Sequence, residues 1–403
     1  MNNIKKGAFG ILSLLTLVGC SNDEVEAPED SNNETTDQIE EEQQAQVEEE
    51  QAIDENEPET IRVSAVGDVI GHADLYKAGD PNQDDEYNYD QMFKYVKPLL
   101  EESEFSIANL ETTLSSDPSE YRGYPSFVTP KELIEGLDYA GFDAVVTANN
   151  HSMDNFANGA IETVEWVEEQ KLPAIGTSTD SESERFYIET INGIDIGVVA
   201  FTSFVNGEES GMFTTEEIHQ HVNMLEEEII QSEIEAVKEF DPDIILAYAH
   251  WGDEYTTELS AEQEHFAQVF AELGVDAVIG SHPHVVQEAD IITHDDHEMF
   301  IIYSVGNFLS NQRYESLGED FRQTEDGVIV HLDYTSSEDA DSVELTDVNF
   351  TPTWVKRETI DDGIYEYAVL PAELHDDESF SEDTRERMKD SYDRTMDHLQ
   401  FSY

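Results

Sequence analysis

The sequence of 403 residues predicts an α/β fold. Apolar runs of strand length alternate with helical segments over the first half of the folded part, and the second half is richer in strands. Several strands also end directly in a polar cluster of metal-ligand type. Because parallel strands place their functional loops at their carboxyl ends, we expect one rim of the sheet to collect these clusters.

Charge is the most unusual property of the composition. Asp and Glu number 93 against 19 Lys and Arg, a net charge of −74, and 38% of the residues are hydrophobic, enough for a sizeable core. Nucleic acid and acidic membrane surfaces both require a basic patch, so we expect neither as a binding partner. Such acidity is typical of adaptation to high salt, and it predicts a halophilic-like protein that is less stable without salt.

The first 20 residues have the pattern of a secretory signal. Lys5 and Lys6 precede an apolar run at 8–18 that is too short to span a membrane, and Gly19-Cys20 follows. Residues 17–20 resemble a bacterial lipobox, in which the cysteine is acylated and becomes the first mature residue. We therefore predict a lipoprotein signal peptide at 1–20 and lipidation of Cys20. The protein would be exported and lipid-anchored to the outer face of the bacterial cell membrane. The alternative is an ordinary signal with a chance cysteine.

Residues 21–60 are predicted to form a disordered acidic tether. They contain 17 Asp or Glu, no Lys or Arg and no apolar periodicity, so they repel themselves and cannot build a core. A flexible chain of this length spans roughly 35 Å. It would hold the folded part clear of the envelope; binding of cations or of a basic partner is the alternative role.

Strands are predicted where apolar or alternating runs meet turn residues. A hairpin is expected at 186–200, because Asn192-Gly193 tolerates the positive φ angles of a tight turn. The other predicted strands cover 61–66, 105–111, 143–148, 243–249, 275–280, 285–293, 298–305, 327–334 and 343–350.

Helices are predicted from amphipathic periodicity and from start and stop signals. Thr129-Pro130 offers a cap and a proline for the first helical position, and Gly141 offers a helix end. The predicted helices cover 89–101, 130–141, 159–169, 215–240, 260–273 and 383–400.

The polar clusters combine carboxylates, amides and imidazoles. This mixture suits Mn²⁺, Fe²⁺ or Zn²⁺ better than Ca²⁺ or Mg²⁺, and a carboxylate within it could bridge two such ions around a phosphate. His151 is the candidate general acid, and Asp154 is placed to orient its imidazole. The candidates are Asp68 with His72, Asn109 with Glu111, Asn150 with His151, His250, His282 with His284, and Asn307.

Most of these clusters also have a purely structural interpretation. Gly67-Asp68 is typical of a turn, the segment 149–151 of a helix N-cap, and a histidine beside Trp251 of a packed core residue. Only His282-Pro283-His284 favours a metal by itself. The joint pattern is stronger than any part because every cluster lies at a strand end; a domain without metal remains the alternative.

The successive motifs resemble those of the CapA family of poly-γ-glutamate capsule biosynthesis proteins (PgsA-like). The resemblance covers about 61–310 and implies membership of the calcineurin-like metallophosphatase superfamily. That implies a four-layer α/β/β/α sandwich with two mixed sheets and a dinuclear site at the sheet rim. Residues 311–403 would add strands that complete the sandwich and an acidic terminal helix. The motifs are Gly67-Asp68, Ala108 to Glu111, Ala148 to His151 with Asp154, His250 to Tyr255, Gly280 to Gln287 and Tyr303 to Phe308.

The resemblance implies a role for each candidate residue. The superfamily usually begins with Asp-x-His, whereas here the nearby histidine is His72. Glu111 replaces a bridging Asp, and Asn149 replaces a Gly. His72, Asn109 and Asn307 are therefore further candidates only, and Asn307 is expected to support the rim. The implied acid is His151, and the implied ligands of two divalent transition metal ions are Asp68, Glu111, Asn150, His250, His282 and His284.

The resemblance further implies an envelope-anchored protein that takes part in making or exporting poly-γ-glutamate beside the membrane subunits of a synthase. The alternative is a secreted metal-dependent phosphoesterase that acts on phosphate esters or cell-wall polymers. A complete ligand set with His151 favours the enzyme, whereas the altered first motif favours an accessory role. Because poly-γ-glutamate is itself a polyanion, its attraction to this acidic chain would need the metals or high salt.

Overall fold

The computed structural model describes residues 58–337, 342–361 and 363–401. The described residues all belong to one compact unit. The predicted signal peptide, Cys20 and the tether up to residue 57 lie outside the described residues. Within the described ranges, no helix is both long and apolar enough to cross a membrane.

The fold contains two mixed sheets, as predicted. In the first sheet, of order β16-β15-β14-β1-β2-β5-β6, the strands from β1 to β6 run parallel and β14 to β16 are added antiparallel. β13 also pairs with β1. The strands of the first sheet are β1 (Thr60–Ile70), β2 (Phe105–Glu111), β5 (Ala144–Val146), β6 (Ala174–Ile175), β13 (Asn307–Leu309), β14 (Asp326–Ser336), β15 (Val343–Asp361) and β16 (Ile364–Pro371).

The second sheet has the order β11-β12-β10-β9-β8-β7, with parallel strands at its centre and an antiparallel strand at each edge. A small separate pair joins β3 (Thr113–Ser115) to β4 (Val128–Pro130). The strands of the second sheet are β7 (Tyr187–Ile191), β8 (Ile194–Thr202), β9 (Ile244–His250), β10 (Ala277–Ser281), β11 (Ala289–His294) and β12 (His297–Ile302).

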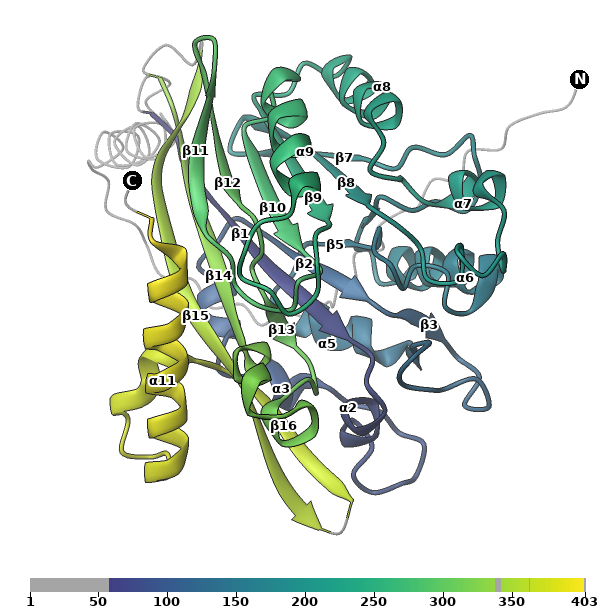
Figure 1. Ribbon diagram of the computed structural model, residues 1–403, viewed down its shortest axis with the longest axis vertical. Coiled ribbons are helices and arrows are strands. Elements are labelled where there is room, and N and C mark those ends of the chain that lie inside the picture. Colours follow the sequence, from purple (N-terminus) through teal and green to yellow (C-terminus); the bar gives the residue numbers. More distant parts are fainter. Residues whose placement is uncertain (1–57, 338–341, 362, 402–403) are drawn as a thin grey trace, which may run out of the picture. The chain divides into compact units, whose positions relative to one another are not determined.

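Helices cover the outer faces of the two sheets (Figure 1). The helices of the described ranges are α2 (Ala73–Ala78), α3 (Asp90–Phe93), α4 (Lys97–Leu100), α5 (Glu132–Ala140), α6 (Phe156–Glu169), α7 (Thr215–His221), α8 (Glu227–Lys238), α9 (Ala261–Glu272), α10 (Tyr314–Leu317) and α11 (Glu382–Leu399), with 3-10 helices η1 (Glu319–Glu325) and η2 (Ala372–Asp376).

Side-chain alternation explains the layers. On β9, Ile244, Leu246 and Tyr248 pack between the two sheets, whereas Ile245 and Ala247 pack outward against α8 and α9. A third cluster lies between the outer face of the first sheet and α3, α4 and α5. Helix, sheet, sheet and helix therefore follow one another, which confirms the α/β/β/α sandwich.

Three predicted helices differ from the observed ones. The segment 215–240 is divided into α7 and α8, because Val222 and Met224 turn inward and form bridges to Thr177 and Thr202. The segment 89–101 is only the two short helices α3 and α4; Pro98 cannot donate the hydrogen bond that a continuous helix needs there.

The third predicted helix begins later than expected. Thr129 and Pro130 end strand β4, and the Thr129 hydroxyl bonds to that of Thr112 at 2.8 Å instead of capping α5. The expected end at Gly141 is confirmed, with φ of 96°. The hairpin turn is confirmed too, because Asn192 and Gly193 both have positive φ.

Several strands were not predicted, and one was predicted too long. The missed strands are β3, β4, β6, β13 and β16, of which the first four are two or three residues long and carry too little pattern. The strand expected at 285–293 begins only at Ala289. The residues before it are taken up by the loop that follows β10.

The terminal helix α11 is tied to β14 by a partly buried ion pair. The Arg394 guanidinium donates to both carboxylate oxygens of Asp326 at 2.8 Å, and Asp326 is 2% exposed. We expect Arg394→Ala to lower the free energy of unfolding by about 3 kcal/mol, because the buried carboxylate loses its partner. Urea unfolding followed by circular dichroism measures this change.

Lys389→Ala on the same helix is the matched control. Lys389 pairs with Asp393 at the exposed surface, and such pairs contribute little. We expect no measurable change for this variant. If Arg394→Ala lost no more stability than Lys389→Ala, the Arg394 pair would not be what holds α11.

Candidate metal centre

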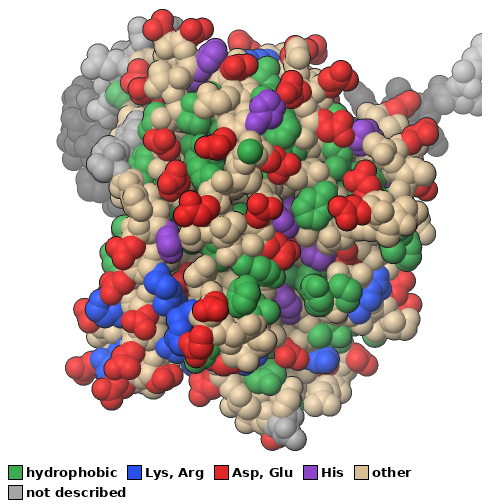
Figure 2. Space-filling view, viewed as in Figure 1, with side chains coloured by type: hydrophobic (Ala, Val, Ile, Leu, Met, Phe, Trp, Pro, Cys, Tyr) green, Lys and Arg blue, Asp and Glu red, His purple; other side chains and the backbone are tan. Residues whose placement is uncertain are grey.

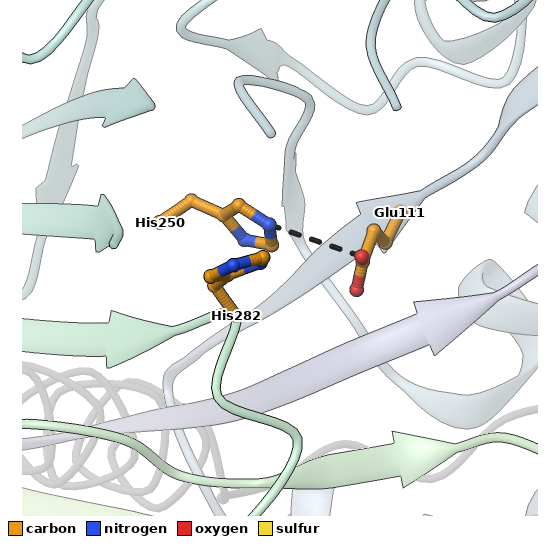
Figure 3. A group of neighbouring side chains, drawn as sticks. All are labelled: Glu111, His250 and His282. Atoms are coloured by element: carbon orange, nitrogen blue, oxygen red, sulfur yellow. Dashed lines mark ion pairs between the residues drawn. The ribbon is translucent and has the colours of Figure 1, made fainter. Parts of the chain in front are cut away.

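The predicted ligands meet where strand ends from both sheets converge. Asp68 and Glu111 come from β1 and β2 of the first sheet, whereas His250 ends β9 and His282 follows β10 of the second. Figure 3 shows Glu111 directed toward the rings of His250 and His282. The expectation of one rim on a single sheet was therefore incomplete: two sheets contribute to the edge.

Three overlapping groups of side chains could each hold a metal ion. Within each group, the donor atoms lie within 4.8 Å of one another. Glu111 belongs to two groups and is therefore placed between them. The groups are Glu111, His250 and His282; Asp68, Glu111 and His284; and Glu254, His282 and His284.

Glu111 gives the clearest test of whether these residues fit a metal. Its side chain is fully buried, and neither carboxylate oxygen has a hydrogen-bond partner. Burial and the neighbouring Asp68 carboxylate raise the pKa of Glu111 well above its usual range. The Oε1 atom lies 3.8 Å from Nε2 of His250 and 4.0 Å from Nε2 of His284. A cation among these donors would compensate the cost of burying the carboxylate, so the residues fit.

Two of the histidines, His250 and His282, are in the protonation state that metal binding requires. Burial and neighbouring histidines hold the pKa values of His250 and His282 well below the usual range, so both rings are neutral at pH 7. The Nδ1 atom of His282 is buried without a partner. His250 Nε2 lies 3.0 Å from the Asn150 side-chain oxygen, and His250 Nδ1 lies 3.0 Å from the Ser281 hydroxyl.

The backbone around the two histidines of the His-Pro-His motif is strained. His282 has φ of 96° and His284 has φ of 58°, in the region that non-glycine residues rarely adopt. Each such residue costs about 1–3 kcal/mol, and strain of this kind gathers at functional sites. Gly280 precedes them in a position where a Cβ would lie 1.9 Å from the Tyr303 carbonyl oxygen, so only glycine fits.

Two of the further candidates hold the ligands in position. Asn109 donates from its side-chain nitrogen to Asp68 at 2.7 Å. The side-chain oxygen of Asn307 lies 3.2 Å from Nδ1 of His284, and its nitrogen donates to the Thr324 carbonyl at 2.8 Å. The Asp68 carboxylate also lies 3.0 Å from His284 Nδ1. These contacts orient a carboxylate and an imidazole, as partners behind metal ligands do.

The contacts of His72 are with residues outside the three donor groups. Its Nδ1 accepts a hydrogen bond from the Asn311 backbone, and its ring packs against Phe127 with centroids 5.1 Å apart. Burial, together with His284 and His151, lowers the pKa of His72 to about 3. It belongs to none of the three donor groups found among the described residues.

His151 and Asp154 form a dyad beside Glu111. His151 Nδ1 lies 2.6 Å from the Asp154 carboxylate, and His151 Nε2 lies 3.9 Å from Glu111 Oε1. The Phe127 ring packs against the imidazole at 4.5 Å between centroids. The dyad thus presents Nε2 to the same space as the metal-ligand groups, the position that a general acid needs.

Glu254 is a residue that the sequence interpretation missed. It lies in the loop after β9 and shares a donor group with His282 and His284. Its position in the sequence is a signal that could have identified it, because it closely follows His250, a candidate ligand at the end of a strand. A carboxylate in an exposed loop of an acidic chain, however, gives no pattern that distinguishes it from its neighbours.

Comparison with known proteins gives matches to capsule proteins. The model of the family described as bacterial capsule synthesis protein PGA_cap matches residues 62–312. The capsule biosynthesis protein CapA of Bacillus anthracis is 28% identical over 234 residues, which cover 56% of this chain and 55% of that protein. This chain therefore spans about half the length of that relative.

The PGA biosynthesis protein CapA of Bacillus subtilis (strain 168) is 25% identical over 279 residues, 67% of this chain and 69% of that protein. Among solved structures, the calcineurin-like phosphoesterase YfkN from Bacillus subtilis superposes with a TM-score of 0.41 and 13% identity over 85% of this chain and all of that chain. A phosphatase from Mycoplasma pneumoniae gives a TM-score of 0.41 and 16% identity over 73% and 94%.

Replacing Glu111 by glutamine tests the fit to a metal. The raised pKa means that folding favours the protonated carboxyl, so the metal-free wild type should lose stability as the pH rises above about 4.5. Glu111→Gln lacks this loss and should be more stable than the wild type at pH 8 in chelator, by about 1–3 kcal/mol. Adding Mn²⁺ should reverse the order, because only the wild type gains metal-linked stability.

Thermal unfolding at pH 5 and pH 8, with chelator and with Mn²⁺, measures both effects. Glu258→Gln is the control, because its side chain is exposed and belongs to no donor group found in the described part of the chain. Equal responses of the wild type and Glu111→Gln to Mn²⁺ would rule out Glu111 as a ligand.

Proposed function

Because the chain belongs to the bacterial capsule synthesis protein family PGA_cap, we propose that it takes part in making or exporting poly-γ-glutamate. The match over residues 62–312 is the observation that carries this proposal. The names of two relatives, a capsule biosynthesis protein and a PGA biosynthesis protein, support it. The chain would act beside membrane subunits of a polymer synthase, with the polymer or a phosphate ester as its ligand.

We further propose that the protein is exported and held at the outer face of the cell membrane by a lipid on Cys20. The basic start, the short apolar run and Leu17-Val18-Gly19-Cys20 support this placement. The acidic segment 21–60 would separate the folded unit from the membrane. At this location the folded unit would have access to a polymer that leaves the cell.

The proposed centre would hold two divalent transition metal ions, such as Mn, Fe or Zn. Asp68, Glu111, His250, His282 and His284 would be their ligands, and Glu111 is the carboxylate that two of the donor groups have in common. Asn150 would add an amide oxygen beside His250. Such ions supply Lewis acidity and lower the pKa of a bound water. The chain itself supplies the neutral imidazoles of His250 and His282, the buried Glu111 carboxylate, and the asparagines Asn109 and Asn307 beside the ligands.

A metal-dependent phosphoesterase is the second candidate function, and the His151–Asp154 dyad favours it. Asp154 accepts from Nδ1–H of the imidazole, so that Nε2 can donate a proton to a departing alkoxide oxygen. Phe127 shields the ring on one face. A protein that acts only as a scaffold would not need this dyad. The dyad is therefore the residue pair that distinguishes the two candidate functions.

Replacement of the chromosomal copy tests the capsule proposal. We expect a double variant, His282→Ala with His284→Ala, to accumulate less cell-associated poly-γ-glutamate than the wild type, because the centre loses ligands on both sides. Cys20→Ser should release the protein from the membrane fraction. Quantities of polymer per cell and of protein in each fraction measure these effects. Normal polymer levels in a strain that lacks the protein altogether would contradict the proposal.

A phosphodiester assay separates the second candidate from the first. On Mn²⁺-loaded protein, His151→Gln should lower kcat for a nitrophenyl phosphodiester by about 10²–10⁴-fold, the usual contribution of a general acid. Its metal content should equal that of the wild type, because His151 is not a proposed ligand. No hydrolysis by metal-loaded wild type would exclude the phosphoesterase but not the capsule role.

A further inference from the structure

Glu254 stands apart from the other donors because it is exposed, whereas the histidines that share its group are buried. Its carboxylate lies within 4.8 Å of a ring nitrogen of both His282 and His284. One of these histidines, His282, is 2% exposed and has an unpartnered Nδ1. A solvent-facing carboxylate thus lies next to a buried imidazole that lacks a partner.

The backbone fixes the place of Glu254 from both sides. On one side, the Trp251 N–H donates to the Ser281 carbonyl at 3.1 Å, and Gly252 turns the chain with φ of 85°. On the other, the Tyr255 N–H donates to the carbonyl of Pro283 at 2.8 Å, between the two ligand histidines. The loop of Glu254 is therefore attached to the His-Pro-His loop itself.

Tyr255 adds a second attachment. Its ring lies 5.8 Å from that of His284 and 5.3 Å from that of Phe321, and its hydroxyl accepts from Gln312 at 3.3 Å. Its φ of 64° is unusual for a tyrosine and shows that the surrounding contacts determine the loop. Glu254 is thus held over the exposed side of the candidate centre and is not part of a freely moving loop.

We propose that Glu254 is a displaceable carboxylate ligand that covers the exposed face of the metal centre and competes there with incoming anions. This inference rests on the proposed dinuclear centre. Two divalent ions carry four positive charges, of which Asp68 and Glu111 compensate two; Glu254 compensates a third. While Glu254 is in place one positive charge remains, and an anion that displaces Glu254 meets two.

Arg122 is a cation beside the dyad. Its guanidinium donates to the backbone carbonyl oxygens of Glu120 and Asp154 and to the side chain of Asn155. These hydrogen bonds hold the loop of Asp154 in place, and none of them involves a member of the three donor groups.

The test compares Glu254→Gln with Asp253→Asn. Both variants remove one charge from the same exposed loop, but Asp253 belongs to no donor group among the described residues. Metal affinity is measured by titration of the metal-free protein with Mn²⁺. Binding of inorganic phosphate and of dimethyl phosphate is then measured by calorimetry at pH 8 on metal-saturated protein.

We expect Glu254→Gln to weaken Mn²⁺ binding by about tenfold, as loss of a supporting ligand does. It should tighten phosphate binding by about tenfold and dimethyl phosphate binding by about threefold, since the repulsion removed is proportional to the charge of the anion. Weaker Mn²⁺ binding together with tighter anion binding would distinguish this role from general damage to the fold, which would weaken the binding of both.

Two results would overturn the inference. One is Mn²⁺ and phosphate affinities for Glu254→Gln that equal those of Asp253→Asn. The other is weaker phosphate binding in Glu254→Gln, which would make Glu254 a helper of anion binding. Failure of the underlying centre is distinguishable, because the wild type itself would then bind no Mn²⁺.

Discussion

The burial of one carboxylate without a hydrogen-bond partner is the constraint on which the candidate centre depends. Glu111 is fully enclosed at the end of β2, and its oxygens face imidazoles at distances too long for hydrogen bonds. An uncompensated charge in such a place is costly, so the fold must either keep the carboxyl protonated or place a cation there. The neutral rings of His250 and His282 and the strained His-Pro-His backbone favour the second alternative.

The two sheets make this enclosure possible. Packing of β1 and β2 against β9 and β10 brings carboxylates from one sheet opposite histidines from the other, and the Tyr248 hydroxyl donates across the interface to the Ile107 carbonyl at 3.0 Å. Two of the three donor groups combine carboxylates of the first sheet with histidines that end or follow strands of the second, whereas Glu254, His282 and His284 all follow strands of the second sheet. The centre is therefore a property of the sandwich and not of a single motif.

The sequence predicted which strand ends come together better than it predicted the elements around them. Polar residues at strand ends are local signals, and the structure brings Asp68, Glu111, His250, His282 and His284 together. The break between α7 and α8 was not predictable from periodicity, because it depends on burial of Val222 and Met224 against other segments. His72 and Glu254 show the same limit. Loop contacts, such as the hydrogen bond from Tyr255 to Pro283, decide which residue near a strand end faces the centre. These are tertiary contacts, which local sequence patterns do not reveal.

The distribution of the few cations bears on how an acidic protein could meet an acidic polymer. In Figure 2, carboxylates are scattered over the visible face, whereas Lys and Arg gather in the region where Figure 1 shows α11. Around that helix, Arg387 pairs with Glu315 and Glu325, and Arg394 pairs with Asp326, so these cations are used to hold the fold. Attraction of a polyanion would then rest on bound metal and on screening by salt. A carboxylate that covers the centre, as we propose for Glu254, would restrict that attraction to groups able to displace it.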